Sequence, residues 1–482
     1  MARLPLWLVH CGRLVHFGPE RCHDRTRRTL TAFSGLFDRA PDAVKAVVRN
    51  FGWMVASRGL AAVFSLIYLA IVTRSLGVSG FGKFALITGA AQLLAHLLAF
   101  ETWQIIVQYG VEHVEKGKRA KLARLFRSAI VLDLISAVTG IAAAALILHF
   151  FADALGLKPT LARATLIFNV IMLVSLRSTP IGILRLRDRF DLAAFADGVT
   201  PTMRLIGAII VGIVHPTLQA FLIAWAIAEL ITAAVHWWAV HKIGDWRLLW
   251  REGGGVGRVF GDNPGIVRFS LTSNFSQTLF MTTKQLPLFL VGGLTGTAAA
   301  GAFRLAAQLS RALTTVSQMV AKAAFPEIVR AVRNQGVISL ASMILRSVRV
   351  TFVVGVVVFA LVVLLGQSIL VAVGGPDFGQ GYASLLWLVA AACTDLLIVA
   401  FEPSIMAAHR AHWAFVARLL ATGAMIGLAF LLEPVMGPDG VAAAVFANAV
   451  IQAVLLGLML VRLIRRKEPI AAPAHPVAPP ET

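Results

Sequence analysis

Apolar runs of about twenty residues follow one another along the chain, separated by short polar connections. A helix of that length crosses about 30 Å of hydrocarbon. We expect twelve spans, at residues 53–75, 82–106, 128–151, 163–184, 197–214, 217–241, 267–291, 298–325, 348–373, 382–406, 414–433 and 438–462. The pattern therefore predicts an all-α polytopic membrane protein.

The composition agrees with this fold class and excludes others. Hydrophobic residues make up 58% of the chain, charged residues only 14%, and the mean hydropathy is +0.79. Soluble domains contain about a quarter charged residues. Three cysteines predict no disulfide framework, and we expect no metal site, cofactor or catalytic group.

The net charge of +20 would fit a nucleic-acid partner if it lay on one soluble face. Instead, the basic residues gather in the connections that follow even-numbered spans. Those at residues 116–127, 185–189, 242–258 and 462–467 are rich in Lys and Arg, whereas the opposite connections hold few. By the positive-inside rule both termini are then cytoplasmic. We expect no nucleic-acid partner.

The chain resembles a duplication of six spans. Residues 82–86 (GKFAL) are similar to residues 301–305 (GAFRL), and both segments open an even-numbered span. An N-lobe at residues 53–241, a linker at 242–266 and a C-lobe at 267–462 follow from this repeat. Because six is even, the two lobes are expected to be related by a pseudo-two-fold axis along the membrane normal, with a cleft between them. The glycine-rich stretch at residues 253–257 lacks the end of a P-loop and is expected to be a flexible joint.

The two ends of the chain lie outside the spans. Residues 1–52 form a basic extension, expected to be cytoplasmic, with an amphipathic surface helix at residues 29–49. The alternative is that translation begins nearer Met54. Residues 463–482, rich in Pro and Ala, are expected to be a disordered cytoplasmic tail.

The helix predicted at residues 298–325 carries polar groups along one face of an otherwise apolar surface. At 100° per residue, this face forms a stripe about 80° wide. It holds Arg304, Gln308, Arg311, Thr315, Gln318 and Lys322. A charge near the middle of a bilayer costs about 2.5 to 3.5 kcal/mol, so the stripe is expected to face protein or water. The sequence thus predicts a cationic compartment suited to an anion.

The preceding span adds to that compartment. Gln277 and Lys284 share one face, and Lys284 lies too deep to reach the interface easily. With Arg304 and Arg311, Lys284 makes three buried cations on adjacent helices, and we predict that these three bind phosphate or pyrophosphate together with Gln277 and Gln308. The alternative is that the cations pair with membrane acids, namely Glu229, Asp395 and Glu402.

Other ionisable groups in the spans have two interpretations. Asp395 and Glu402 lie on one helix face, and they are candidate ion-coupling residues, as is His96. The alternative roles are partners of the arginines for the two acids, and a hydrogen-bonded membrane histidine for His96. Arg204 shares a face with Asp197, so a pair between these two residues is the alternative to a cavity role for Arg204.

Three short motifs point to a known family. The first external turn reads RSLGVSGFGKF (residues 74–84), the eighth span ends AFPEIVR (324–330), and the last span opens GPDGVA (437–442). In this order and spacing they resemble the polysaccharide biosynthesis flippases of the MOP (multidrug/oligosaccharidyl-lipid/polysaccharide) exporter superfamily. The resemblance covers residues 53–465.

The resemblance implies a V-shaped, two-lobed transporter and not an enzyme. Such a transporter moves a polyprenyl-diphosphate-linked oligosaccharide across a bacterial inner membrane, and central cations attract the anionic lipid carrier. It implies membrane lipids as partners, together with a glycan polymerase or glycosyltransferases. The chain departs from the family pattern in its N-terminal extension and in Lys284, since many relatives carry an acid in that span.

Two other functions fit the same spans. An ion-coupled multidrug or metabolite exporter of the same superfamily would use an acid-centred site at Asp395 and Glu402. A non-transporting scaffold for glycan assembly would use the basic N-terminal segment as its contact. Drug sensitivity with intact glycans favours the exporter, and glycan loss after removal of residues 1–50 favours the scaffold.

Overall fold

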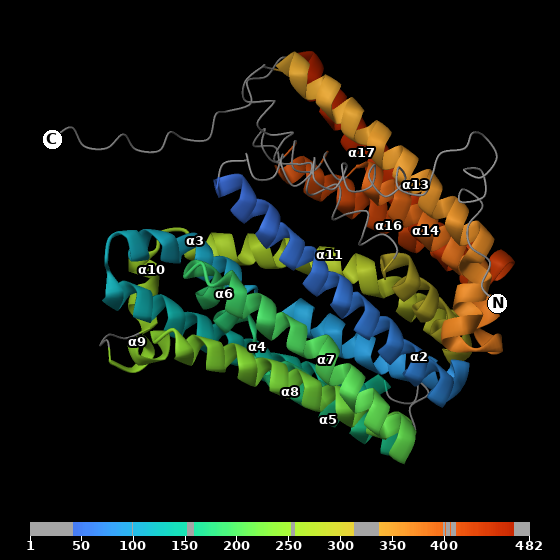
Figure 1. The fold of residues 1–482 in the computed structure, drawn as a ribbon, viewed down its shortest axis with the longest axis horizontal. Coiled ribbons are helices and arrows are strands. Elements are labelled where there is room, and N and C mark those ends of the chain that lie inside the picture. Colours follow the sequence, from blue (N-terminus) through green and yellow to red (C-terminus); the bar gives the residue numbers. More distant parts are fainter. Residues whose placement is uncertain are drawn as a thin grey trace, which may run out of the picture. The chain divides into compact units, whose positions relative to one another are not determined.

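The fold comes from a computed structural model that describes residues 42–98, 100–151, 159–251, 256–312, 337–398, 401, 405 and 411–466 (Figure 1). Its contacts divide the chain into two units, residues 1–57 and 58–482. Of the first unit, only the helical residues 42–57 are described. The expectations about residues 1–41, Thr315, Gln318, Lys322, Glu402, the 324–330 motif and the C-terminal tail lie outside the described residues.

Every described element is helical. The elements are α2 (Asp42–Leu98), α3 (Thr102–Glu115), α4 (Arg119–Phe151), α5 (Pro159–Val174), α6 (Ser178–Leu186), α7 (Phe190–Val214), α8 (Leu218–Lys242), α9 (Asp245–Arg251), η3 (Val256–Arg258), α10 (Val259–Asp262), α11 (Ile266–Leu294), α13 (Val337–Gly374), η4 (Pro376–Gly381), α14 (Tyr382–Leu397), α16 (Ala411–Met436) and α17 (Pro438–Arg466). Residues 297–312 are also helical.

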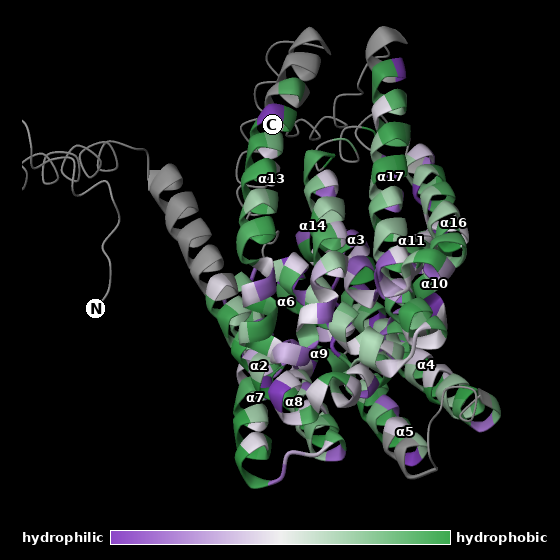
Figure 2. Ribbon diagram, turned by 90° about the vertical axis from the view of Figure 1, so that its right-hand side faces the viewer, coloured by the Kyte–Doolittle hydropathy of each residue, from purple (hydrophilic) through white to green (hydrophobic). Residues whose placement is uncertain are grey.

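The apolar character of these helices confirms a membrane protein. Nine helical segments among the described residues are long and apolar enough to cross a membrane. Figure 2 shows how apolar residues dominate α13 and α17. Large apolar side chains such as Val138, Ile213, Leu364 and Val435 are exposed. In water such exposure favours aggregation, whereas in hydrocarbon it costs nothing. The helix α11 occupies the seventh expected span but is too polar to count among the nine.

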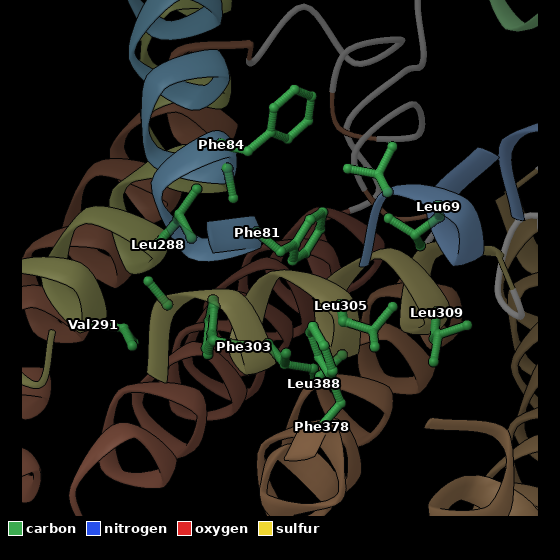
Figure 3. Packing of buried hydrophobic residues seen from close by; sticks show 14 of the residues in the cluster. Leu69, Phe81, Phe84, Leu288, Val291, Phe303, Leu305, Leu309, Phe378 and Leu388 are labelled. Atoms are coloured by element: carbon green, nitrogen blue, oxygen red, sulfur yellow. The ribbon is translucent and has the colours of Figure 1, made fainter. Parts of the chain in front are cut away.

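The largest buried cluster lies where α2, α11 and the helix at residues 297–312 meet (Figure 3). Phe81 and Phe84 come from α2, Leu288 from α11, and Phe303 from the helix at 297–312. Phe81 also packs against Phe378 of η4, with ring centroids 6.0 Å apart. This packing fixes α11 and residues 297–312, which carry the predicted cationic stripe, against α2.

Two glycines bring α2 and residues 297–312 into close contact. A Cβ atom added to Gly82 would collide with the main chain of Thr297, and one added to Gly301 would collide with the main chain of Val78. Each contacted residue lies four positions before the opposite glycine, so the contact is reciprocal. These glycines open the two similar segments of the sequence. A reciprocal contact of equivalent residues is what a two-fold relation between repeats produces.

Two expected spans are broken, contrary to the prediction of continuous helices. The span at 82–106 changes helix between Leu98 and Thr102, and the span at 163–184 changes between Val174 and Ser178. The buried carboxylate of Asp133 bonds to residues at both breaks. It accepts a hydrogen bond from Thr102 Oγ1 (2.8 Å) and two from the Thr179 hydroxyl and main-chain N–H (2.7 and 3.2 Å). Negative charge is stabilised at helix N-termini, and here one carboxylate accepts hydrogen bonds from the first turns of α3 and α6.

Much of the linker at residues 242–266 is helical. Residues 245–251 and 256–262 are helical. The Asp262 carboxylate binds Arg124 at 2.7 Å and Lys121 at 3.1 Å, and Asn263 lies 2.8 Å from His113. These contacts attach the end of the linker to α3 and α4. The glycines at residues 253–255, where we expect the flexible joint, lie outside the described residues.

Candidate functional site

Arg304 is the buried cation of the predicted stripe, with 6% of its surface exposed. Its Nη1 donates a hydrogen bond to Gln285 Oε1 at 3.2 Å, and Gln285 Nε2 donates in turn to Gln92 Oε1 at 2.8 Å. Among the described residues, no carboxylate lies within ion-pair distance of this guanidinium. A buried charge without an opposite charge is costly, so Arg304 attracts any anion that reaches it.

Lys284 lies near a carboxylate. Its Nζ is 3.5 Å from Asp395 Oδ2, and the two side chains are 45% and 36% exposed. The expected alternative, pairing with a membrane acid, is therefore present for Lys284. An ion pair this exposed is weak, and it leaves much of the ammonium accessible.

Arg311 is exposed, and its Nη2 donates to the main-chain carbonyl of Lys284 at 3.4 Å. Of the three predicted cations, Arg304 is buried whereas Arg311 and Lys284 are exposed, and their shared role as an anion site stays a prediction. Arg311 and Lys284 meet through this hydrogen bond, and Arg304 lies two helical turns before Arg311 on the same helix.

The remaining predicted residues lie near this group or on the same helices. Gln277 is half-buried on α11, two turns before Lys284, and Gln308 is half-buried one turn after Arg304. His96 is on α2, with Nδ1 3.9 Å from Glu101 Oε1, and its main-chain carbonyl accepts a hydrogen bond from Thr278 of α11. These residues are placed by the structure, and their roles stay predictions.

A second ionic group, in the N-lobe, was not predicted as a site. Glu229 of α8 is fully buried, and its two carboxylate oxygens pair with Arg204 of α7 and with Arg177 at the start of α6, the latter at 2.7 Å. Trp225 Nε1 donates to Glu229 Oε1 at 3.0 Å, and the Arg204 guanidinium stacks 3.9 Å from the Trp225 ring centroid. One acid thus holds two guanidinium groups.

The alternative pairing of Arg204 with Asp197 is wrong. Asp197 lies 3.4 Å from His236 of α8, and Arg204 turns to Glu229 instead. Residues seven apart share a helix face, but the partner on the neighbouring helix is closer. The sequence offers one indication of this ionic group. Trp225 and Glu229 are four residues apart and therefore lie on one face of α8.

The two ionic groups border one buried cluster. That cluster contains Leu305, which follows Arg304 on its helix, and Trp225, against which Arg204 stacks and Tyr68 of α2 packs edge-on. We define the central charge cluster as Arg177, Arg204, Glu229, Lys284, Arg304, Arg311 and Asp395. Its described members hold five cations and two carboxylates. The cluster therefore carries surplus positive charge and suits an anionic ligand.

The part of the chain that the structure describes holds no group of three or more His, Cys, Asp or Glu side chains placed to bind a metal ion. The chemistry of the central charge cluster is instead that of guanidinium and ammonium groups. Both bind phosphate well, the guanidinium through two parallel hydrogen bonds.

Comparison with solved structures identifies the fold. The chain is similar to the lipid II flippase MurJ in an inward closed conformation, with a TM-score of 0.66 and 12% identity over 86% of this chain and 89% of that one. It is also similar to an inward-facing multidrug resistance MATE family transporter of the MOP superfamily. There the TM-score is 0.59 and the identity 15%, over 84% and 95% of the two chains.

Sequence comparison identifies the family. The inner membrane protein YghQ of Escherichia coli (strain K12) is 24% identical over 299 residues, which are 60% of this chain and 82% of that protein. Residues 47–332, more than half of the chain, match the family described as polysaccharide biosynthesis protein. The chain belongs to the polysaccharide biosynthesis protein family.

Proposed function

We propose that this protein moves a polyprenyl-diphosphate-linked oligosaccharide, such as a repeat unit of O-antigen, exopolysaccharide or capsule, from the inner to the outer face of a bacterial inner membrane. The observation that carries the proposal is the buried guanidinium of Arg304, which has neutral amide partners and lies in a cluster with surplus positive charge. The family membership supports the glycan part of the proposal.

The physical requirement matches this site. A diphosphate with about two negative charges and a hydrated sugar chain cannot enter hydrocarbon unaided, because transfer of charged and polar groups out of water costs many kcal/mol. Arg304, Arg311 and Lys284 supply the opposite charges, with Gln277 and Gln308 as further hydrogen-bonding groups. The oligosaccharide follows through a hydrated path, and the lipid tail stays in the bilayer.

The architecture that serves this function includes features predicted from the sequence. We propose twelve spans in two lobes, at residues 53–241 and 267–462, joined by the linker at 242–266, with both termini cytoplasmic. Alternating access between the lobes then exposes the site to each face in turn. The name of the Escherichia coli relative supports the inner membrane as the location. MurJ, described as a lipid II flippase, supports the class of transport.

The driving force involves ionisable groups near the cationic site. Among our candidates for a coupling-ion site, Asp395 lies 3.5 Å from Lys284, so a bound cation would compete with that lysine. A cation bound at Asp395 would weaken its hold on Lys284 and so change the charge available to the substrate. Glu402 and His96 are the other candidates, and glycosyltransferases or a glycan polymerase are the expected partners.

Reconstituted flipping tests the proposal. Purified protein is placed in liposomes that contain a lipid-linked oligosaccharide, and exposure of the glycan to an external glycosidase is followed with time. We expect the Arg304→Gln and Lys284→Gln variants to lose most of the rate. Arg187→Gln is the matched control, since Arg187 is 32% exposed and pairs with Asp245, outside the central charge cluster.

Two outcomes would contradict the proposal. One is a rate in the Arg304→Gln and Lys284→Gln variants equal to that of the natural protein. The other is transport of organic cations without glycan flipping, which would favour the ion-coupled exporter with its acid-centred site at Asp395.

A further inference from the structure

Asp133 is a buried acid that the proposed function leaves unused. It lies in the membrane-spanning helix α4 and is 6% exposed. Among the described residues, no basic group lies within ion-pair distance of its carboxylate. Glu229, in contrast, pairs with two arginines, and Asp395 pairs with Lys284. A buried carboxylate without an opposite charge is costly, and the uptake of a proton removes that cost.

Three donors hold the ionised carboxylate of Asp133, and they are shared unequally between its two oxygens. Oδ1 accepts only from the Thr102 hydroxyl, at 2.8 Å. Oδ2 accepts from both the hydroxyl and the N–H of Thr179, at 2.7 and 3.2 Å. A proton therefore enters most easily at Oδ1, where it displaces a single donor. That donor is a hydroxyl group, which can also accept a hydrogen bond.

A complete set of hydrogen bonds also exists for the protonated acid. The new O–H at Oδ1 donates to Thr102 Oγ1, and the Thr102 hydroxyl turns its own hydrogen toward Thr179 Oγ1, 3.4 Å away. The hydroxyl and N–H of Thr179 continue to donate to Oδ2. Both threonines are fully buried, where an unpaired polar group is costly. Rotation of one hydroxyl is thus enough to accommodate a proton.

Two further titratable side chains lie close to this group along the chain. Glu101 directly precedes Thr102, and its Oε1 lies 3.9 Å from Nδ1 of His96. The side chains of His96 and Glu101 are 39% and 19% exposed. Exposure therefore falls from His96 to Glu101 to Asp133, as a route for a proton from water to the buried acid requires.

Other charged groups on the elements packed against α4 are paired or lie far along their helices. Arg177, at the beginning of α6, binds Glu229. The only ionisable residue of α5 is Arg163, three turns before the end of that helix. In the linker, Asp245 and Asp262 bind arginines at the end of α6 and near the beginning of α4. The charge of Asp133 is therefore decided by its burial, the two threonines and Glu101.

We propose that Asp133 binds and releases a proton, and that this proton switches how firmly α4 holds the beginnings of α3 and α6. Hydrogen bonds to an ionised group are about twice as strong as those between neutral groups, so protonation loosens both helix breaks. Ser273 of α11 donates a hydrogen bond to Gln104 of α3, so a change at the first break reaches the contact between α3 and α11. The use of this switch in transport rests on the proposed function.

Infrared difference spectra of the full-length protein in nanodiscs, recorded during a pH titration, test for the proton. A protonated carboxyl group has a C=O stretching band that an ionised one lacks. We expect the band of a buried acid to appear on acidification of the natural protein and to be missing in Asp133→Asn. Asp395→Asn, which removes a half-exposed acid, is the matched control and should keep the band. Identical spectra for the natural protein and Asp133→Asn would overturn the proposal.

Variants of Thr102 keep the test decisive if Asp133→Asn fails to fold. Thr102→Val removes the donor to Oδ1, and the ionised form loses more by this than the protonated form. We expect the midpoint of the infrared titration to rise by about one pH unit, as the loss of one hydrogen bond to a charged group implies. Thr102→Ser retains the hydroxyl and should titrate like the natural protein. An unchanged midpoint in Thr102→Val would contradict the switch at Oδ1.

Hydrogen exchange and flipping separate the switch from the proposed function. The exchange rate of the Thr179 amide, corrected for its intrinsic pH dependence, should rise on acidification of the natural protein and stay constant in Asp133→Asn. A constant rate in both would overturn the loosening of the breaks. If the natural protein flips no lipid-linked oligosaccharide, the proposed function fails and the spectra still decide the switch. If Asp133→Asn flips with the natural pH profile, the switch has no role in transport.

Discussion

The partly exposed Arg177 and Arg204 and the buried Arg304 are held in different ways. In the N-lobe, Arg177 and Arg204 share the buried carboxylate of Glu229. In the C-lobe, Arg304 is held by the neutral amide of Gln285. A carboxylate cancels part of the charge and fixes the guanidinium, whereas an amide fixes it and leaves the charge in full. Glu229 therefore fixes the positions of Arg177 and Arg204, whereas Arg304 keeps the positive charge that attracts an anion.

The largest expected effect is on stability, from Glu229. Removing one member of a buried ion group leaves the other charges uncompensated and typically costs about 3–5 kcal/mol. We expect Glu229→Leu to lower the free energy of unfolding by about that much, measured by denaturation in detergent. Asp395→Leu, which removes a half-exposed partner, should cost below about 1 kcal/mol. Equal losses in the two variants would remove the distinction between the lobes.

The glycine contact between the lobes gives the next largest effect. Gly82→Ala and Gly301→Ala each place a methyl group against the opposite main chain, and overpacking of this kind costs about 1–3 kcal/mol. Because the contact is reciprocal, we expect the two losses to be similar. Gly427→Ala, on α16 with no atom within 4 Å of the added carbon, is the control. A loss in only one of the two would contradict the symmetry of the contact.

The pair formed by Lys284 and Asp395 is expected to be weak. Both side chains are more than one-third exposed, so the ion pair should be worth about 0.2–1 kcal/mol. A double-mutant cycle with Lys284→Gln and Asp395→Asn measures this coupling in unfolding experiments. A coupling above about 2 kcal/mol would show that the ammonium is held as firmly as the N-lobe arginines, against the proposed role in attraction.

The smallest effect concerns the linker and depends on pH. Burial raises the pKa of Asp262, but the hydrogen bonds and charges of Arg124 and Lys121 outweigh it and leave the pKa below its ordinary value. The stability that this carboxylate contributes is therefore present above its ordinary pKa, near about pH 4, and is lost as the pH falls through the lowered value.

The Asp262→Asn variant tests this dependence. It should be slightly less stable than the natural protein at pH 7, with a difference that shrinks as the pH falls below about 4. Thermal unfolding in detergent across this range measures the difference. A difference that grows on acidification would mean that the carboxylate destabilises the linker contact.

The sequence predicted the helical membrane fold well, because a long apolar run crosses a bilayer as a helix that satisfies its own backbone hydrogen bonds. The family was predicted from short motifs. It predicted Arg304 as a buried cation from its helix face alone. It missed the breaks at residues 98–102 and 174–178, which depend on Asp133 in a distant part of the chain. It also missed the partner of Arg204, since helix periodicity describes one helix and says nothing about its neighbour.

The most direct test of the central claim compares lipids that differ only in charge. Binding of a polyprenyl diphosphate, a polyprenyl monophosphate and the neutral polyprenol is measured with the protein in nanodiscs, for the natural chain and for Arg304→Gln. We predict that affinity rises with the number of phosphates and that Arg304→Gln reduces this difference at least about tenfold. Equal affinity for the diphosphate and the neutral alcohol would contradict the account.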